Sequence, residues 1–223
     1  MHCEMMIEPA ILRAALIFAG EEDIRAYLNG VRIEADATGI KAIATDGTRA
    51  FIAQCESVRT EPVAFTLERE ALEGALKLHS KNPMYIRLVY DRPERPDPER
   101  PGVTIVGLAV VTIGQVQSVD HAEASGRYPE WRRIVPEKCS GELAHFNVDY
   151  LADCAKARKI LGAGKCPGMF TVHHNGNSAA AIPLRHDVLA ILMPFREGHS
   201  EYAPPAWINQ EIPAEEPAKS EAA

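Results

Sequence analysis

The side chains able to do chemistry in this chain are scattered, and their spacings do not match known catalytic patterns. The run Gly162–Lys165 precedes Cys166, whereas a phosphate-binding loop needs a longer glycine spacing and a hydroxyl directly after the lysine. His173 and His174 are neighbours in the sequence. On a strand their side chains would point to opposite faces, so they could not bind one metal ion together.

Two aspartates also suggest catalysis at first sight. Asp187 follows His186 and could orient its imidazole, but no serine or cysteine nucleophile motif accompanies the pair. Asp46 stands between Thr45 and Gly47, where a turn explains an aspartate better than acid or base chemistry does. We therefore expect no catalytic residue, no metal site and no cofactor, and we predict that the chain is not an enzyme.

The composition indicates a globular protein. The chain has 223 residues, of which 46% are hydrophobic and 25% charged, so it can form one large or two small domains. No apolar run approaches the roughly 20 residues that cross a bilayer, so we expect no membrane association and a cytoplasmic location. Five cysteines form an odd set without a C-x-x-C pair, which argues against a disulfide framework and a zinc site.

The net charge of −7 argues against a nucleic-acid partner only if the charge is spread evenly. Much of the acidic excess lies in the proline-containing tail after residue 200. The remaining body can therefore still present a basic surface locally.

The elements that must position these residues follow a pattern that repeats three times: a strand, a helix, and then three strands. In the first copy Pro9 opens a helix that ends at Gly20, and strands are predicted over residues 27–35, 40–44 and 49–54. In the second copy Thr66 is the expected N-cap of a helix over 67–79, after a strand at 63–65.

The rest of the second copy is predicted as strands over 84–90, 103–108 and 110–119, with bulges at Gly107 and Gly114. Four prolines in residues 92–101 predict an exposed loop without regular structure. The third copy is predicted as a strand over 143–146, a helix capped by Asn147, and strands over 169–173, 179–184 and 188–195.

Three short motifs connect this pattern to a known family. They are residues 27–30 (Tyr-Leu-Asn-Gly) running into 44–49 (Ala-Thr-Asp-Gly-Thr-Arg), 126–133 (Gly-Arg-Tyr-Pro-Glu-Trp-Arg-Arg), and 192–196 (Leu-Met-Pro-Phe-Arg). In this order, the chain resembles the β subunit of bacterial DNA polymerase III, the sliding clamp family. The resemblance implies an α+β DNA-clamp fold, with antiparallel sheets outside and helices lining a central hole.

The resemblance also implies a division of the chain. Residues 1–126 resemble a complete clamp domain of two repeat units, and 127–136 resemble the linker that leaves it. Residues 137–198 resemble a third unit, which is half of a clamp domain. Residues 199–223 are predicted to be a disordered acidic, proline-rich tail.

A clamp ring contains twelve such units, so four chains of three units each would complete one. We therefore favour a homotetramer over a dimer of mutually completing half domains. Both assemblies would cover the sheet edges that a half domain leaves open.

By resemblance, the functional site is a pocket for a short linear motif of replication proteins. Its apolar walls would bind an anchor side chain, and methionine would adapt to different partners. The pocket residues implied are Leu28, Thr45, Gly47, Thr48, Arg49, Ala50, Pro129, Arg133, Ile134, Met193, Pro194 and Phe195. Ala50 is smaller and Phe195 bulkier than the usual clamp residues. The pattern alone favours core positions on strands for Leu28, Ala50, Met193 and Phe195, whereas the resemblance favours the pocket.

Basic residues on or near the predicted helices are the expected contacts to double-stranded DNA. Such contacts reach phosphates and carry no sequence information, as sliding requires. The residues implied are Arg13, Arg69, Lys77, Lys81, Lys156, Arg158, Lys159 and Lys165. The alternative is an ordinary solvated helix face, on which Asp153 pairs with Lys156.

The function implied by the resemblance is a processivity factor that encircles DNA as a homo-oligomeric ring and tethers DNA polymerase or other replication proteins. A clamp loader is a further implied partner. The alternative is a clamp-like interaction protein that does not encircle DNA and binds or competes for clamp-binding peptides.

Overall fold

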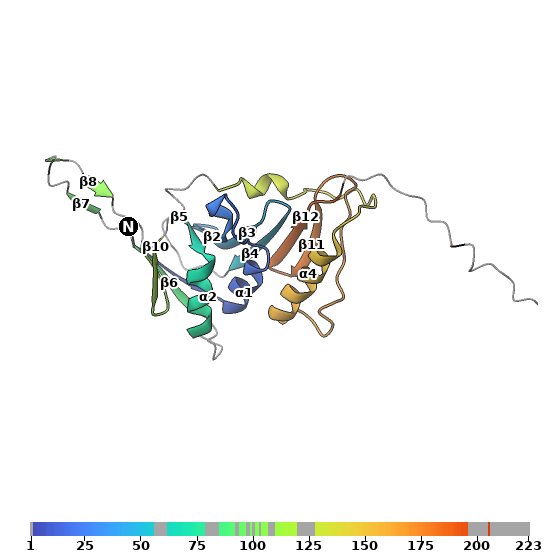
Figure 1. Ribbon diagram of the computed structural model, residues 1–223, viewed down its shortest axis with the longest axis horizontal. Helices are drawn as coiled ribbons and strands as arrows, with labels where there is room; N and C mark the ends of the chain where they lie inside the picture. Colours follow the sequence, from blue (N-terminus) through green and yellow to red (C-terminus); the bar gives the residue numbers. More distant parts are fainter. Residues whose placement is uncertain are drawn as a thin grey trace, which may run out of the picture.

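The computed structural model describes residues 2–55, 62–78, 85–91, 94–96, 99, 101–102, 104–106, 110–119, 128–195 and 205. Within these residues the helices lie along one side of the β-sheets (Figure 1). They are α1 (Pro9–Leu16), α2 (Arg69–Leu78) and α4 (Val148–Ile160). None of the described helices is long and apolar enough to span a membrane.

The larger sheet has six strands in the order β11-β12-β4-β3-β2-β5. Its strands are β2 (Gly30–Asp36), β3 (Gly39–Thr45), β4 (Arg49–Cys55), β5 (Val63–Glu68), β11 (Ala180–Arg185) and β12 (Val188–Leu192). All five neighbouring pairs are antiparallel.

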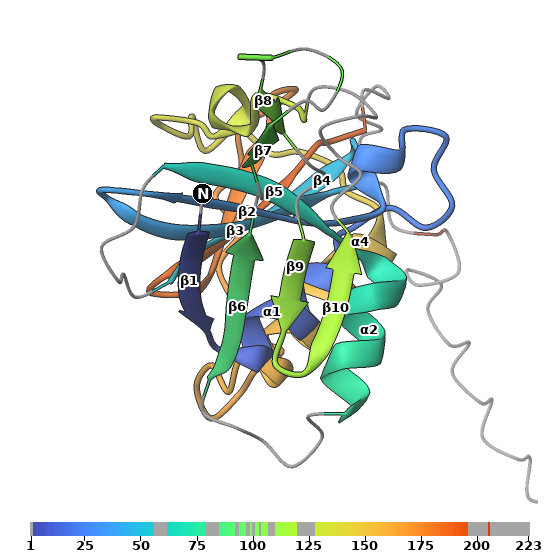
Figure 2. The same cartoon turned by 90° about the vertical axis from the view of Figure 1, so that its left-hand side faces the viewer.

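A second sheet has four strands in the order β1-β6-β9-β10, and Figure 2 shows it facing the viewer with α2 beside β10. Its strands are β1 (His2–Ile7), β6 (Ile86–Asp91), β9 (Val110–Ile113) and β10 (Val116–Val119). A small separate ribbon pairs β7 (Glu94–Pro96) with β8 (Thr104–Val106).

The first two repeat units exchange their opening strands. β1, which precedes α1, pairs with β6 of the second unit, whereas β5, which precedes α2, pairs with β2 of the first. Each unit therefore completes the sheet of the other, and α1 and α2 pack together beneath the joined sheets. α2 contacts β2 of the first unit as well as β10 of its own, so its burial uses strands from both units.

The third unit joins the first through its main chain. β12 pairs with β4 over five residues, from Val188 opposite Ala53 to Leu192 opposite Arg49. α4 packs against α1, so α1 lies between α2 and α4 (Figure 1). One hydrophobic core runs through all three units.

Strand alternation decides which side chains enter that core. In β3 Ile40, Ala42 and Ala44 face the helices, and in β4 Phe51 and Ala53 do the same. α1 carries small residues and buries most of its surface, because it is covered by the sheet and by a helix on each side.

Local signals explain the helix starts. Pro9 occupies the first turn of α1, where its missing N–H costs nothing. The Asn147 side chain accepts a hydrogen bond from Asp149 N at 2.9 Å, which confirms the predicted N-cap of α4.

Thr66 was predicted as an N-cap, but it lies within β5 opposite Arg32 and α2 starts at Arg69. The sheet pairing with β2 extends the strand past the threonine.

Several predicted strands are wrong in detail. Residues 26–28 form a 3-10 helix, so β2 starts at Gly30, not at residue 27. Residues 110–119 form a hairpin, because Gly114 adopts a φ of +61° and reverses the chain. Residues 94–96 are a strand despite their proline, which a two-stranded ribbon tolerates since every strand is an edge.

The outer segments of the third unit are shorter than predicted. Residues 143–146 and 169–173 each contribute a single β-bridge, His145 to Phe195 and His173 to Ala181. Predictions that concern residues 79–84, 92–93, 97–98, 100, 103, 107–108, 120–127 and 196–198, and the tail except Pro205, lie outside the described residues. The predicted domain boundaries stay predictions.

Gly30 provides the first testable prediction. A Cβ at this position would lie 2.1 Å from the carbonyl oxygen of Leu67, so Gly30→Ala must push β2 from β5. We expect a loss of about 3 kcal/mol in the free energy of unfolding. Urea unfolding followed by circular dichroism measures it.

Gly74→Ala is the matched control. Gly74 lies inside α2 with no heavy atom within 4 Å of the added Cβ, so this variant should gain about 0.5 to 1 kcal/mol. Equal stability of the two variants would contradict the close approach at Gly30.

Candidate functional site

The face of the six-stranded sheet that points away from the helices carries an unexpected apolar row. Ile43, Ala50 and Ile191 alternate with the core residues of their strands, yet each is fully buried. Ala50 lies between Thr45 of β3 and Ile191 of β12 in the strand register. This outer row is the floor of the candidate site.

The linker crosses this outer face. A 3-10 helix, η2 (Trp131–Ile134), lies above the sheet on the side opposite the helices (Figure 1). Tyr128 Oη donates to Ile43 O at 3.4 Å, and Trp131 Nε1 donates to Glu34 Oε2 at 3.3 Å. Burial raises the pKa of Tyr128 well above its ordinary value. These contacts hold the linker over the sheet.

A structured loop forms a second side of the site. The Asn29 side chain donates to Asp23 O and accepts from Asp23 N, which closes residues 23–29 into a compact turn. Arg25 donates to Asp46 O at 3.3 Å, and its guanidinium lies over Gly47. Leu28, which belongs to this loop, is buried.

The turn between β3 and β4 depends on Asp46. Its carboxylate accepts from Thr48 N at 2.8 Å and from Arg49 N at 3.0 Å. These bonds confirm that Asp46 is a turn residue. Thr45 Oγ1 also donates to Arg49 O and accepts from Gly47 N, so the turn is rigid.

Two exposed apolar side chains lie beside this turn. Met193 N donates to Thr48 O at 3.0 Å, which places the end of β12 next to the β3–β4 turn. The Met193 side chain is 38% exposed and that of Phe195 is 54% exposed. Large apolar side chains that are exposed to water side by side are typical of a docking site.

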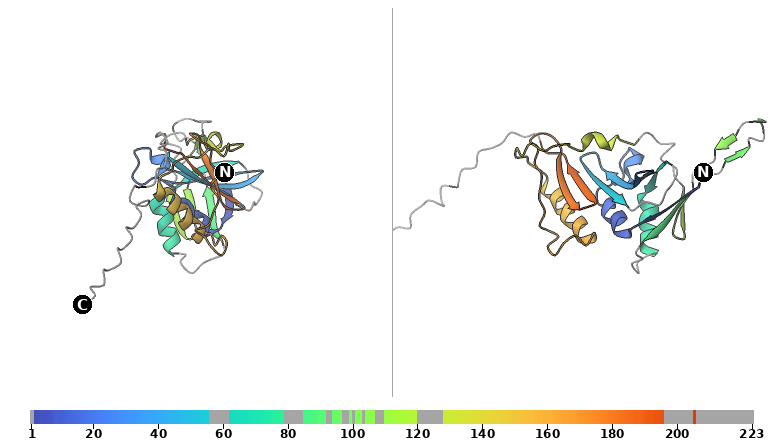
Figure 3. Two further views of the ribbon diagram at one scale, coloured as in Figure 1. Left: turned by 90° about the vertical axis from the view of Figure 1, so that its right-hand side faces the viewer. Right: turned by 180° about the vertical axis from the view of Figure 1, so that it is seen from behind.

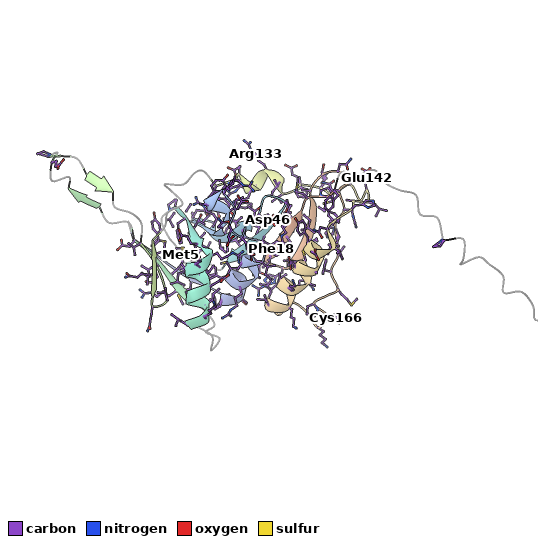
Figure 4. All side chains as sticks on the ribbon, viewed as in Figure 1. Met5, Phe18, Asp46, Arg133, Glu142 and Cys166 are labelled. Carbon is purple, nitrogen blue, oxygen red and sulfur yellow. The ribbon has the colours of Figure 1, made fainter. Side chains whose placement is uncertain are left out.

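The structure thus brings together the first and last predicted pocket segments. Leu28, Thr45 and Ala50 are buried, whereas Gly47, Thr48, Met193 and Phe195 are exposed beside them. Pro129 and Arg133 are exposed on the linker, and Ile134 and Pro194 are half-buried. Figure 4 labels Arg133 on the linker side and Asp46 on the sheet below it.

Ile191 and Tyr128 belong to the site but were missed from the sequence. Ile191 lies directly opposite Ala50. The alternation of side chains along a strand could have predicted it, because Ile191 is two residues before Met193 and therefore faces the same side. Nothing in the sequence indicated that Tyr128 would reach β3, because that contact spans 85 residues.

Arg49 was expected to orient a peptide, but its guanidinium is used within the chain. It donates to Asp46 Oδ2 at 2.8 Å, to Asp153 Oδ2 of α4, and to Ile17 O at 3.0 Å. Burial would raise the pKa of Asp153, yet hydrogen bonds from Lys156 and Arg49 outweigh it and hold that pKa below its ordinary value. Arg49 therefore ties α4 to β4.

All three arginines that were predicted to contact DNA donate to main-chain carbonyls. Arg13 reaches Leu76 O, which links α1 to α2. Arg69 donates to Leu16 O, Ala19 O and Gly20 O, and so caps the end of α1. Arg158 donates to Pro167 O and Leu184 O.

The predicted lysines remain on the surface. Lys77, Lys156, Lys159 and Lys165 are exposed, and Lys81 lies outside the described residues. Lys156 pairs with Asp153 at 2.8 Å, as predicted from their spacing. A mixed-charge cavity between α1 and α4, which includes Asp46, Asp153 and Lys156 in its lining, adds no strongly basic surface.

The other chemical candidates have structural partners. Asp187 accepts from Arg185 at 2.7 Å, and His186 beside it is exposed. His174 Nδ1 accepts from Ala144 N. Among the described residues there is no cluster of three histidine, cysteine or acidic side chains able to hold a metal ion.

Comparison with known proteins adds independent information. The sequence is 27% identical over 130 residues to the β sliding clamp of Vibrio cholerae, across 55% of this chain and 30% of that protein. The structure matches a sliding clamp of Pseudomonas aeruginosa, crystallised with a ligand, with a TM-score of 0.61. No protein-family model matches the sequence.

The chain is a homologue of the bacterial β sliding clamps. The predicted α+β DNA-clamp fold is confirmed, and so is the prediction that the chain is not an enzyme, because sliding clamps are not catalysts. The match covers 87% of this chain and 66% of the Pseudomonas clamp, at 16% identity. A clamp of Borrelia burgdorferi, in complex with a natural product, gives a TM-score of 0.60 at 12% identity over 88% of this chain and 65% of that one.

This clamp homologue covers 30% of the length of the Vibrio clamp and 66% of that of the Pseudomonas clamp, which is less than two thirds of each.

The Arg49–Asp153 contact predicts how stability depends on pH. Because the folded pKa of Asp153 is lowered, its ionised form stabilises the fold above the unfolded value of about 4, and this contribution disappears as pH falls through the folded value. Asp153→Asn should cost about 1 to 2 kcal/mol at neutral pH and progressively less below about pH 4. Urea unfolding across pH measures both effects.

Asp149→Asn is the control, since Asp149 is exposed on the same helix. Its difference from the unmodified protein should stay within about 0.5 kcal/mol. A pH-independent cost for Asp153→Asn would refute the ionised contact.

Proposed function

We propose that this clamp homologue is a processivity factor whose copies close into a ring around duplex DNA and tether replication proteins. The observation that carries the proposal is the pairing of β12 with β4, which continues one sheet from the first repeat unit into the third. A ring of clamp units needs sheets that continue in this way from unit to unit. Four chains of three units each would supply twelve units.

The helix side is the proposed DNA surface. The exposed residues Lys77, Lys159 and Lys165, together with the paired Lys156, provide its positive charge. Contacts to phosphates alone would let the ring slide, because they do not depend on base sequence. Arg13, Arg69 and Arg158 would support this face from within, since their donors are used by main-chain carbonyls.

The outer face is the proposed peptide pocket. Ala50 and Ile191 form its apolar floor, and Met193 and Phe195 are exposed at its rim. A short linear motif of a DNA polymerase or another replication protein would place an apolar anchor there.

The proposal includes further partners. A clamp loader would open or assemble the ring, and the assembly would work in the cytoplasm, where bacterial DNA is replicated. We propose a homotetramer as the self-associated form.

A second candidate is a clamp-like interaction protein that binds clamp-binding peptides without encircling DNA. The observation in its favour is that Arg13, Arg69 and Arg158 donate to main-chain carbonyls, so these donors are not free to bind DNA phosphates. Assembly size and topological retention on DNA separate the two candidates.

The ring is tested by threading. The protein is mixed with linear DNA, which is then ligated into circles, and the circles are isolated by gel filtration in about 1 M salt, where electrostatic binding is screened. We expect at least about tenfold more protein on circles than on the same DNA cut afterwards. Light scattering of the free protein should give the mass of four chains.

Protein added only after ligation is the control for trapping, and it should not be retained without a loader. Equal retention on cut and circular DNA, or a monomeric mass at micromolar concentration, would reject the ring. Peptide binding that persists in that case would support the second candidate.

The pocket is tested by truncating its rim. Met193→Ala combined with Phe195→Ala should weaken binding of a fluorescent peptide, carrying the clamp-binding motif of a bacterial polymerase, by about tenfold or more. Fluorescence anisotropy measures the affinity, and light scattering checks that assembly is unchanged.

Met169→Ala is the matched control, because Met169 is 74% exposed and lies on a different segment. It should leave peptide affinity unchanged. The pocket assignment fails if the double variant binds as tightly as the unmodified protein.

A further inference from the structure

The rim residue Phe195 is held by a main-chain hydrogen bond to a segment that precedes α4. Phe195 N donates to His145 O at 2.9 Å. His145 belongs to residues 140–146, which we call the strap. In the view from behind, the chain between η2 and α4 runs at the end of the molecule formed by β11 and β12 (Figure 3). The position of Phe195 therefore depends on the position of the strap.

The strap is fastened to the loop of residues 173–176. At the start of the strap, Gly141 N donates to His174 O at 3.0 Å. Nearer to the pocket rim, Ala144 N donates to the imidazole of the same histidine, at 3.2 Å from Nδ1. Ala144 directly precedes the residue whose carbonyl holds Phe195. The bond to Nδ1 therefore fixes the part of the strap on which the rim depends.

Only one charge state of His174 can accept this bond. Nδ1 accepts a hydrogen bond when the imidazole is neutral and its proton lies on Nε2, whereas the imidazolium carries a proton on both nitrogens. The His174 ring is half-buried, and its centroid lies 5.6 Å from that of Phe146. A proton on Nδ1 would point at the N–H of Ala144, so the strap would have to move. Histidine is the side chain that changes charge between about pH 5 and pH 8.

Other charged or titratable groups lie on the elements around His174. They are Glu142 and His145 of the strap, His173 of the same loop, Asp149 of α4 and Arg185 of β11. All but the arginine are exposed, and Arg185 forms ion pairs with Glu8 and Asp187. The effect of pH on His174 must therefore be separated from theirs, which a substitution of His174 alone achieves.

We infer that His174 is a positioning residue for the pocket rim and makes peptide binding depend on pH. In its neutral form it anchors the strap, and His145 O then holds Phe195 in place. When Nδ1 gains a proton, the strap loses its bond from Ala144 and the rim loses its fixed position. Peptide affinity is therefore full at high pH and decreases as the pH falls. This inference rests on the proposed function for the pocket, but not for the strap.

Peptide affinity at two pH values tests the role of His174. In fluorescence anisotropy with the polymerase-motif peptide, binding should weaken about fivefold between about pH 8 and about pH 5.5, as expected for the loss of one hydrogen bond. His174→Asn keeps an acceptor oxygen at the position of Nδ1 but has no proton to gain in this range. Its affinity should stay within about twofold of that of the unmodified protein at the higher pH, at both pH values.

Two further variants are controls. His174→Gln carries its acceptor oxygen one bond further out, so it should bind about fivefold more weakly at both pH values. His186→Asn removes a histidine whose side chain is 89% exposed on the β11–β12 turn, and it should keep the pH dependence of the unmodified protein. Circular dichroism confirms that each variant is folded. An equal pH dependence in His174→Asn and the unmodified protein would overturn the inference.

A second measurement does not require a peptide. Amide hydrogen exchange is followed by NMR on isotope-labelled protein and corrected for the intrinsic exchange rate at each pH. Protection of the Ala144 and Phe195 amides should fall about fivefold from about pH 8 to about pH 5.5. The amide of Met193, which donates to Thr48 O, should keep its protection.

Unchanged protection of the Ala144 amide would show that His174 does not anchor the strap, and the inference would fail. If protection falls as expected but no peptide binds at either pH, His174 still positions the strap and the proposed pocket fails. The two failures can therefore be told apart.

Discussion

The antiparallel pairing of β12 with β4 is the constraint on which the rest of the structure depends. It turns two sheets into one and sets the third unit beside the first. Two arginines fasten this junction on either side. Arg49 reaches Asp153 of α4, and Arg185 reaches the carboxylate of Glu8, ahead of α1, at 2.8 Å. Because α1 lies inside the junction, most of its residues are apolar and buried.

The same junction creates the candidate pocket. Adding β12 to β4 brings Ile191 opposite Ala50, and the chain beyond β12 then runs beside the β3–β4 turn, where Met193 N meets Thr48 O. The linker closes the outer face from above through Tyr128 and Trp131. The pocket is therefore a consequence of joining units, since no single unit contains both its floor and its rim.

Arginines and lysines have different roles on the helix side of the molecule. A guanidinium can satisfy several carbonyls at once, which suits the ends of helices whose last carbonyls lack partners. Arg69 does this for α1, and Arg158 does it for the loop after α4 and for β11. Lysines, which have flexible stems and strong hydration, remain on the surface, so the helix side depends on them for its positive charge.

The sequence by itself determined the repeating elements and the family. Alternating apolar residues placed β2, β3, β4 and β12 nearly correctly, and Asn147 marked the start of α4, because periodicity and capping are local properties. Thr66, residues 27–28 and Gly114 were misread where sheet pairing or a positive φ overrode propensity. Only the tertiary structure decided which strands are exchanged and that Arg49 ties helix to sheet. Those features depend on contacts between residues far apart in the chain. Such contacts produce no pattern in the local sequence from which they could be predicted.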